Sequence, residues 1–305
     1  MRTHDVKRLV AYYVKKYETR NPFRLAEYLN VFVHVGPLGS RAGCYMFLKN
    51  HKCIFLNEDL NEQERMLVMA DLIVALDVST KAEVADVLRR LGDSIDFYKI
   101  GLELFSAEGP DVVRLVKDAG KRVFLDLKLH DIPRTVERAV KSGATLGVDL
   151  MTIHSTGGKA MIRAAADAAA SFGAAAPKIL AVTALTSLDQ DDLTDLGIQR
   201  AMPNQVEAMG LLAITNGADG IVCSPKEVAN MNKVLIPAAQ GRKVVFVTPG
   251  VRPAGAAIGD QKRVATPAGA VRDGSTHLVV GRPILEAVDP VAAAIAIRAE
   301  MDSAL

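Results

Sequence analysis

Residues 122–136 read Arg-Val-Phe-Leu-Asp-Leu-Lys-Leu-His-Asp-Ile-Pro-Arg-Thr-Val, which predicts a strand that carries charges and then breaks. Successive side chains of a strand point to opposite faces, so Asp126 and Lys128 are expected on one face and the three neighbouring leucines on the other. Charged side chains on a buried strand are expected to be paired or to have a function, because burial of an unpaired charge costs much free energy. The pattern indicates a functional site. The plain alternative is a salt-bridged strand end that only fastens the next helix.

Asp131 lies beyond the end of this strand. Pro133 follows two residues later. Proline cannot donate a hydrogen bond to a neighbouring strand, and it restricts the backbone conformation of the residue before it. The chain is therefore expected to turn here. The Asp131 carboxylate can then reach either its own site or that of a neighbouring chain.

Outward from this strand, short β-branched runs alternate with Ala-rich helical stretches. The runs predict eight strands, at residues 72–77, 97–100, 123–128, 150–154, 179–183, 220–223, 244–248 and 278–280. Alternating strands and helices are typical of parallel strands with right-handed crossovers, and eight such units predict an α/β fold, the (β/α)8 TIM barrel. An open doubly wound sheet is the alternative. Such a sheet usually carries the phosphate-binding motif Gly-x-Gly-x-x-Gly after its first strand. This motif is absent after the first predicted strand, which favours the barrel.

Composition excludes several classes of function. The chain has 305 residues, half of them hydrophobic, so it can bury a full core. Its net charge is only +2 and it has no tryptophan, so no nucleic-acid partner is expected. The apolar runs are too short to span a bilayer, so no membrane partner is expected either. Three cysteines without metal-ligand spacing, and no signal peptide, predict a cytoplasmic protein.

In a barrel of this class the chemistry takes place at the C-terminal ends of the strands. The residues predicted there are mostly polar: Asp77, Lys99, Asp126, Lys128, His154, Thr186, Arg252, Gly281 and Arg282. Gly281 allows close approach of the backbone, and Pro283 suits the first position of a helix. A helix N-terminus with Arg282 beside it is a phosphate site, so the ligand is predicted to carry a phosphate.

The segment between Pro249 and Pro267 is rich in Gly, Ala and Pro and contains Arg252 and Gln261. A segment of this length can fold over a bound ligand as a lid. A plain surface loop is the alternative.

The run Asp126-Leu-Lys128-Leu-His-Asp131-Ile-Pro resembles the signature of the orotidine 5′-phosphate decarboxylase family, bacterial type. The resemblance covers about residues 70–303. Its other motifs follow in order: Ala75-Leu-Asp77, Tyr98-Lys99-Ile-Gly, His154 with Gly157-Gly158-Lys159, Val182-Thr-Ala-Leu-Thr186-Ser, Val222-Cys-Ser, Thr248-Pro-Gly-Val-Arg252-Pro, Asp260-Gln261 and Val280-Gly281-Arg282-Pro.

This resemblance implies a homodimer that converts orotidine monophosphate to uridine monophosphate and carbon dioxide, with neither metal nor organic cofactor. It implies that Lys128 donates a proton to C6 of the pyrimidine and stabilises the developing carbanion. Asp126 would face the substrate carboxylate, and Asp131 would come from the partner subunit. Lys99 would complete the catalytic set.

The same resemblance implies a set of substrate-binding residues. Asp77 and Lys99 would bind ribose hydroxyls, with Asp126 beside the carboxylate. The remaining contacts would come from Ile132, Thr135 and Thr186 around the nucleoside and from Arg252, Gln261, Arg282 and the Gly281 amide at the phosphate.

Residues 1–68 lie outside the barrel pattern of residues 69–305 and predict a small α+β extension. Helices are expected at 5–17, from 21–22 and from 61, and strands at 31–35 and 52–56. Arg20-Asn-Pro-Phe-Arg-Leu-Ala, Tyr45-Met-Phe-Leu and Ile54-Phe-Leu-Asn resemble the front of an ImmA/IrrE-type zinc metallopeptidase. Its His-Glu-x-x-His motif is absent, so neither a zinc site nor peptidase activity is expected.

Two other functions stay open from the sequence. One is a magnesium-dependent sugar-phosphate decarboxylase or aldolase of the same barrel superfamily, which uses a related acidic-Lys-acidic strand. The other is a binding module, in which the extension recognises a partner and the barrel has no catalytic part.

Overall fold

The computed structural model describes residues 31–36, 43–48, 51–57, 70–252 and 265–304. The chain divides into two compact units, with the boundary between Met69 and Ala70. The helices predicted at 5–17, from 21–22 and from 61 lie outside the described residues.

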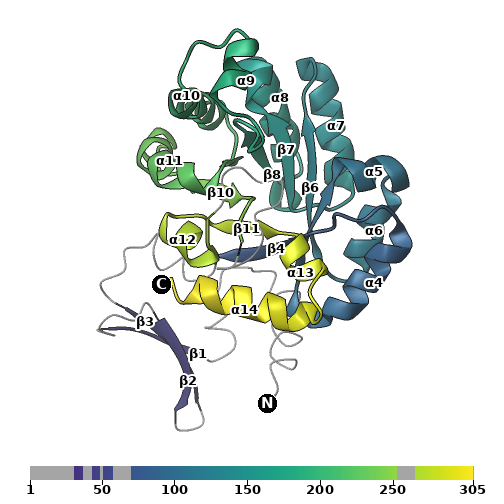
Figure 1. Cartoon of the computed structure of the whole chain (residues 1–305), viewed down its shortest axis with the longest axis vertical. Coiled ribbons are helices and arrows are strands. Elements are labelled where there is room, and N and C mark those ends of the chain that lie inside the picture. Colours follow the sequence, from purple (N-terminus) through teal and green to yellow (C-terminus); the bar gives the residue numbers. More distant parts are fainter. Residues whose placement is uncertain (1–30, 37–42, 49–50, 58–69, 253–264, 305) are drawn as a thin grey trace. The chain divides into compact units, whose positions relative to one another are not determined.

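The N-terminal unit contains a three-stranded sheet, coloured purple in Figure 1. Strands β1 (Val31–Gly36) and β3 (His51–Asn57) agree with the predicted ones and pair in parallel. Strand β2 (Gly43–Leu48) was not predicted, and it pairs antiparallel with the other side of β3.

The second unit is a closed barrel of eight parallel strands, so the predicted TIM-barrel fold is confirmed (Figure 1). The strand order is β10-β11-β4-β5-β6-β7-β8-β9. All eight strands coincide with predicted ones to within two residues at each end: β4 (Asp71–Ala75), β5 (Phe97–Gly101), β6 (Arg122–Leu129), β7 (Leu150–His154), β8 (Lys178–Val182), β9 (Gly220–Val222), β10 (Val245–Thr248) and β11 (His277–Val280).

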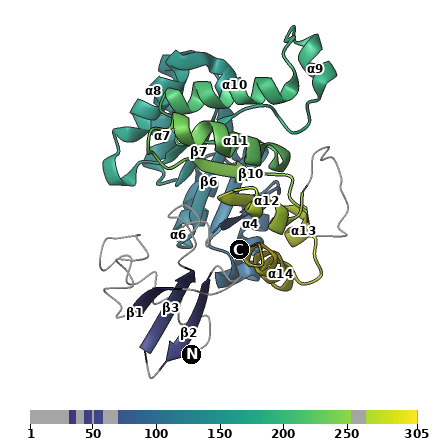
Figure 2. The same ribbon diagram turned by 90° about the vertical axis from the view of Figure 1, so that its left-hand side faces the viewer.

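Helices surround the barrel, as Figures 1 and 2 show from two directions. Local sequence sets where several begin: the Thr80 hydroxyl accepts the Glu83 amide in a capping box, and Pro133 opens the helix after β6. The helices are α4 (Lys81–Leu91), α5 (Leu102–Glu108), α6 (Asp111–Asp118), α7 (Pro133–Thr145), α8 (Gly158–Ala170), α9 (Gln190–Asp195), α10 (Met202–Thr215), α11 (Pro225–Ala238), α12 (Pro267–Arg272), α13 (Arg282–Leu285) and α14 (Pro290–Asp302).

Apolar side chains fill the interior of the barrel. Nine buried residues form this core: Ile73, Ala75, Phe97, Phe124, Leu150, Leu180, Val245, Val247 and Val279. Asp77, Lys99 and Asp126 each follow one of these core residues by two positions, so they belong to the same inward face. The apolar core therefore ends where a cluster of charges begins.

Side chains at the N-terminal ends of the strands fix the register between neighbours. Asp149, just before β7, accepts the Val123 amide of β6 at 2.9 Å. Asp219 accepts the Ile179 amide at 2.8 Å and Thr276 accepts the Phe246 amide at 2.9 Å, each reaching the neighbouring strand in the same way. These bonds satisfy amides that the strand ladder leaves free at its start.

Arg122, the first residue of β6, holds an ion-pair network at this end of the barrel. Its guanidinium donates two 2.8 Å hydrogen bonds to Asp71, contacts Asp96 at 3.1 Å, and lies 4.3 Å from the centre of the Phe97 ring. Burial opposes ionisation of Asp71, but Arg122 outweighs it and lowers the pKa of that carboxyl. Burial also lowers the pKa of His277 to about 4, so this ring is neutral at pH 7.

Replacing Arg122 should destabilise the barrel more than replacing an exposed arginine. Arg122→Met leaves Asp71 and Asp96 without their shared cation and its hydrogen bonds, so the free energy of unfolding should fall by about 1.5–3 kcal/mol. Arg114→Met, which removes an exposed pair with Asp111 within one helix, should cost at most about 0.5 kcal/mol. Urea unfolding followed by circular dichroism suits a chain without tryptophan. Equal losses in the two variants would show that the network adds nothing to stability.

Candidate active site

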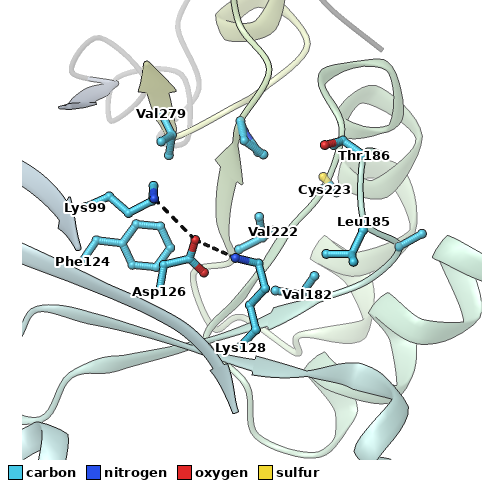
Figure 3. Close-up of a pocket in the computed structure, with 12 residues that line it drawn as sticks. Lys99, Phe124, Asp126, Lys128, Val182, Leu185, Thr186, Val222, Cys223 and Val279 are labelled. Atoms are coloured by element: carbon cyan, nitrogen blue, oxygen red, sulfur yellow. Dashed lines mark hydrogen bonds and ion pairs between the residues drawn. The ribbon is translucent and has the colours of Figure 1, made fainter. Parts of the chain in front are cut away.

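Four side chains of alternating charge form a line across the C-terminal ends of β4, β5 and β6. Asp77 Oδ1 lies 3.3 Å from Lys99 Nζ, which lies 4.0 Å from Asp126 Oδ2. Lys128 Nζ donates to the same Asp126 oxygen at 2.9 Å. Figure 3 shows both lysines directed toward Asp126 from opposite sides. We call these four residues the charged array.

The middle of the charged array is the most enclosed part of it. The side chains of Lys99 and Asp126 are 14% and 12% exposed, whereas Lys128 is 37% exposed. Like charges are separated by opposite ones along the line, which offsets the cost of removing them from water. Because little water screens this region, each charge acts strongly on any group bound beside it.

Strand β6 is irregular where it carries the two catalytic candidates. Leu125 pairs with Met151 and Leu129 with Ile153, so three residues of β6 lie opposite Thr152 alone. Lys128 has φ +52°, a left-handed conformation that costs a non-glycine residue about 1–2 kcal/mol. Asp126 and Lys128 do meet, but the regular alternation predicted for this strand is wrong at Lys128.

Thr152 occupies the gap opposite this irregularity and is fully buried. Its hydroxyl accepts the Lys128 amide at 2.8 Å and donates to Asp126 Oδ1 at 2.9 Å. Sequence reasoning missed this residue. The available signal was one hydroxyl residue inside the otherwise apolar run Leu150-Met-Thr-Ile.

The charged array faces a pocket of about 160 Å³. A cavity of roughly 150 Å³ holds one benzene molecule, so a six-membered ring fits this space. Opposite the charges the wall is mostly apolar, as Figure 3 shows. The lining residues are Lys99, Phe124, Asp126, Lys128, Val182, Ala184, Leu185, Thr186, Val222, Cys223, Pro249 and Val279.

Several of these lining residues were not predicted. Phe124, Val182, Val222 and Val279 belong to apolar strands, and nothing in their sequence separates them from core residues. Cys223 is buried and also lines the pocket. Thr186 lines the pocket from the segment after β8.

Two glycines leave room for the charged array. A Cβ on Gly101 would lie 3.0 Å from Lys99 Nζ. A Cβ on Gly281, which follows β11, would lie 2.9 Å from Asp77 Oδ2 and 3.4 Å from the Ala75 Cβ. Close packing at Gly281 brings the end of the last strand to the end of the first.

Of the predicted phosphate residues, Arg282 directly follows this glycine. Arg282 is exposed and is the first residue of α13, so the helix begins one residue before Pro283, the predicted first position. Arg252 is partly buried, and its amide donates to the Ala265 carbonyl at 3.0 Å. Gln261, and with it the predicted lid, lies outside the described residues.

Asp131, Ile132 and Thr135 are exposed on a single chain. Asp131 Oδ1 accepts the Ile132 amide at 2.7 Å. Within the described residues no ion pair joins Asp131 to Lys128 of the same chain, so the structure does not bring Asp131 into the charged array.

His130 and His154 contact each other, with ring centres 5.6 Å apart. Burial, then the neighbouring His130 and Lys128, lower the pKa of His154. This ring is therefore neutral at pH 7 and is not among the residues that line the pocket.

Among the residues that the structure describes, no group of three or more His, Cys, Asp or Glu side chains could hold a metal ion. Asp126 has both oxygens occupied, one by Thr152 and the other by Lys128. In the same described part of the chain, no helix has the length and apolarity needed to cross a membrane.

A closed (β/α)8 barrel with paired charges at the mouth of a ring-sized pocket defines a TIM-barrel enzyme. The chain belongs to the orotidine 5′-phosphate decarboxylase / HUMPS family, whose model matches residues 70–297. It is 49% identical over 248 residues to the orotidine 5′-phosphate decarboxylase of Moorella thermoacetica, covering 80% of this chain and 96% of that relative. It is 48% identical over 233 residues to the enzyme of the same name from Rhodopseudomonas palustris strain HaA2, covering 76% and 95%.

A solved structure agrees with this assignment. The crystal structure of orotidine 5′-phosphate decarboxylase from Lactobacillus acidophilus is similar with a TM-score of 0.68 and 40% identity, over 76% of this chain and 99% of that one. The family match begins at residue 70. The resemblance of the extension to ImmA/IrrE-type metallopeptidases has no support from these comparisons.

Proposed function

We propose that the pocket decarboxylates orotidine 5′-phosphate to uridine 5′-phosphate in pyrimidine biosynthesis, without a cofactor and with Lys128 as the proton donor. The observation that carries this proposal is the charged array at the edge of a ring-sized pocket, in a chain of this family. The substrate is a nucleotide, whose pyrimidine ring would occupy the pocket with C6 toward Lys128.

In the proposed reaction the bond between C6 and the carboxyl carbon breaks, and its electron pair stays on C6 as carbon dioxide leaves. The Lys128 ammonium then donates a proton to C6, forms the new C–H bond and becomes a neutral amine. The same ammonium stabilises the negative charge that develops on C6 before the transfer. Solvent returns the proton to the lysine, so no other reactant is needed.

Asp126 and Lys99 support this step. Asp126 holds the Lys128 ammonium at 2.9 Å and would lie beside the substrate carboxylate. Lys99, 4.0 Å from the same carboxylate of Asp126 and 3.3 Å from Asp77, balances the charge of both acids. We assign the ribose hydroxyls to Asp77, whose side chain is 58% exposed at the outer end of the array, and to Lys99, which lies next to it.

Binding energy at the far end of the nucleotide would drive assembly of the site. Arg252, Arg282, Gln261 and the Gly281 amide are the proposed phosphate contacts, and Thr186 is the proposed pyrimidine contact. Close packing of Gly281 against Asp77 supports the assignment, since it joins the phosphate end to the charged array. Interactions with such a remote group can stabilise the closed state in which the reaction takes place.

The proposed active form is a homodimer in which Asp131 completes the array of the partner subunit, with Ile132 and Thr135 beside it. Ile132 is 67% exposed on the single chain, and Leu102, the first residue of α5, is 60% exposed. Burial of these two side chains against a second chain would remove apolar surface from water and so favour the dimer. A nucleotide substrate and an odd number of cysteines favour the reducing cytoplasm as its location.

Decarboxylation of orotidine 5′-phosphate should proceed at the same rate with and without a metal chelator. Lys128 and Thr152 already donate to the two oxygens of Asp126, and the Lys128 ammonium supplies the positive charge beside C6, so the proposed step needs no divalent cation. Loss of substrate absorbance, measured in matched samples with and without EDTA, tests this expectation. Activity that disappears with EDTA and returns with Mg²⁺ would instead favour the magnesium-dependent sugar-phosphate enzymes of the superfamily.

Lys128→Ala should lower kcat by at least about 10³-fold, because it removes both the proton and the charge that stabilises the carbanion. The matched control is Lys233→Ala, which removes an exposed lysine from the middle of α11. Circular dichroism and binding of uridine monophosphate check that the variant keeps its fold and its pocket. Near-normal turnover by Lys128→Ala would overturn the assignment of the proton donor.

Mixing two inactive variants should restore activity if Asp131 acts across the dimer. In an equal mixture of Asp131→Ala and Lys128→Ala, half of the dimers are hybrids and each hybrid has one intact site. Complete exchange should therefore give about one quarter of wild-type activity. Mass spectrometry of the intact dimers measures the exchange independently. No recovery after proven exchange would mean that Asp131 acts within its own chain.

A further inference from the structure

We propose that Thr152 is a positioning residue of this reaction, whose hydroxyl holds Asp126 and Lys128 in their reactive arrangement. This inference rests on the proposed function and adds to it a residue that does not itself line the pocket.

The first observation is the irregular pairing of β6 with β7. Three residues of β6, from Asp126 to Lys128, lie opposite Thr152. Such a bulge takes backbone groups out of the strand ladder, and the Lys128 amide is one of them. Thr152 replaces the missing strand partner, because its hydroxyl accepts that amide at 2.8 Å.

The second observation is the direction of the two hydrogen bonds. A backbone N–H can only donate, so the Thr152 oxygen must accept from Lys128. The one hydroxyl proton is then left for Asp126 Oδ1, 2.9 Å away, which must accept it. Asp126 Oδ2 accepts from Lys128 Nζ, so each oxygen of the carboxylate has its own donor.

Together these bonds close a ring through one strand and its neighbour. Thr152 fixes the Lys128 backbone on one side and the Asp126 carboxylate on the other, and Asp126 fixes the Lys128 ammonium. Thr152 is fully buried, so no solvent molecule competes for its hydroxyl. Removal of the hydroxyl frees both the backbone conformation at Lys128 and the rotation of the carboxylate.

Three substitutions separate the hydroxyl from the volume of the side chain. Thr152→Val keeps the shape and removes the hydroxyl, Thr152→Ser keeps the hydroxyl and removes the methyl group, and Thr152→Cys keeps a weak hydrogen-bonding group. We expect Thr152→Val to lower kcat about tenfold or more, with KM changed less than about threefold, because the phosphate and ribose contacts are untouched. Thr152→Ser should recover most of the loss.

Thr276→Val is the matched control. Thr276 also accepts a backbone amide from a neighbouring strand, that of Phe246 at 2.9 Å, but it does so at the opposite end of the barrel from the pocket. Its substitution should lower the midpoint of thermal unfolding and leave kcat unchanged.

Steady-state kinetics with orotidine 5′-phosphate and thermal unfolding of all four variants test the proposal. A kcat for Thr152→Val within twofold of wild type would overturn it, as would a Ser variant as impaired as the Val variant or an equal loss of kcat in Thr276→Val. Should Thr152→Val not fold, Thr152→Cys decides: a reduced kcat with unchanged KM supports the proposal, and a wild-type kcat overturns it. Absence of turnover in the wild type would instead contradict the proposed function itself.

Discussion

The pairing of β11 with β4 closes the barrel, and the site depends on that closure. Four residues of each strand pair in parallel, from His277 with Asp71 to Val280 with Val74. Gly281 directly follows Val280, and Asp77 lies shortly after Val74, so the two residues pack against each other. In an open sheet these two ends would lie at opposite edges, and the proposed phosphate contacts would be separated from the charged array.

The apolar core lies directly below the charged array, and it reduces the screening of these charges by water. Phe97 and Phe124 fill the barrel one step beneath Lys99 and Asp126 on the same strands. Water cannot reach the array from below, so the attraction between its members is screened only from the mouth of the pocket. Ordered charges that need not reorganise during a reaction can stabilise a transition state more effectively than solvent does.

The sequence predicted the eight strands because the alternation of β-branched runs with helical stretches repeats eight times. It also predicted that Asp77, Lys99 and Asp126 would cluster, since the C-terminal ends of barrel strands meet at one face and each of these residues was expected there. It could not predict the irregularity of β6, because a period of two contains no sign of extra residues in one strand. Thr152 was missed for the same reason, since its role depends on register with a neighbouring strand. Strand β2 was missed in the extension, and Gln261 lies outside the described residues.

Strand β6 combines the stability of the barrel with its proposed chemistry. Arg122 begins the strand in the ion-pair network at the N-terminal end, Phe124 belongs to the core, and Asp126 and Lys128 face the pocket. A slip of one residue in its pairing would turn this whole column of side chains away from the interior. The Arg122 pair with Asp71 and the Asp149 bond to the Val123 amide both fix the start of the strand. The register of β6 at its N-terminal end determines which of its side chains face the pocket at its C-terminal end. The Arg122 network therefore helps to position the charged array without contacting it.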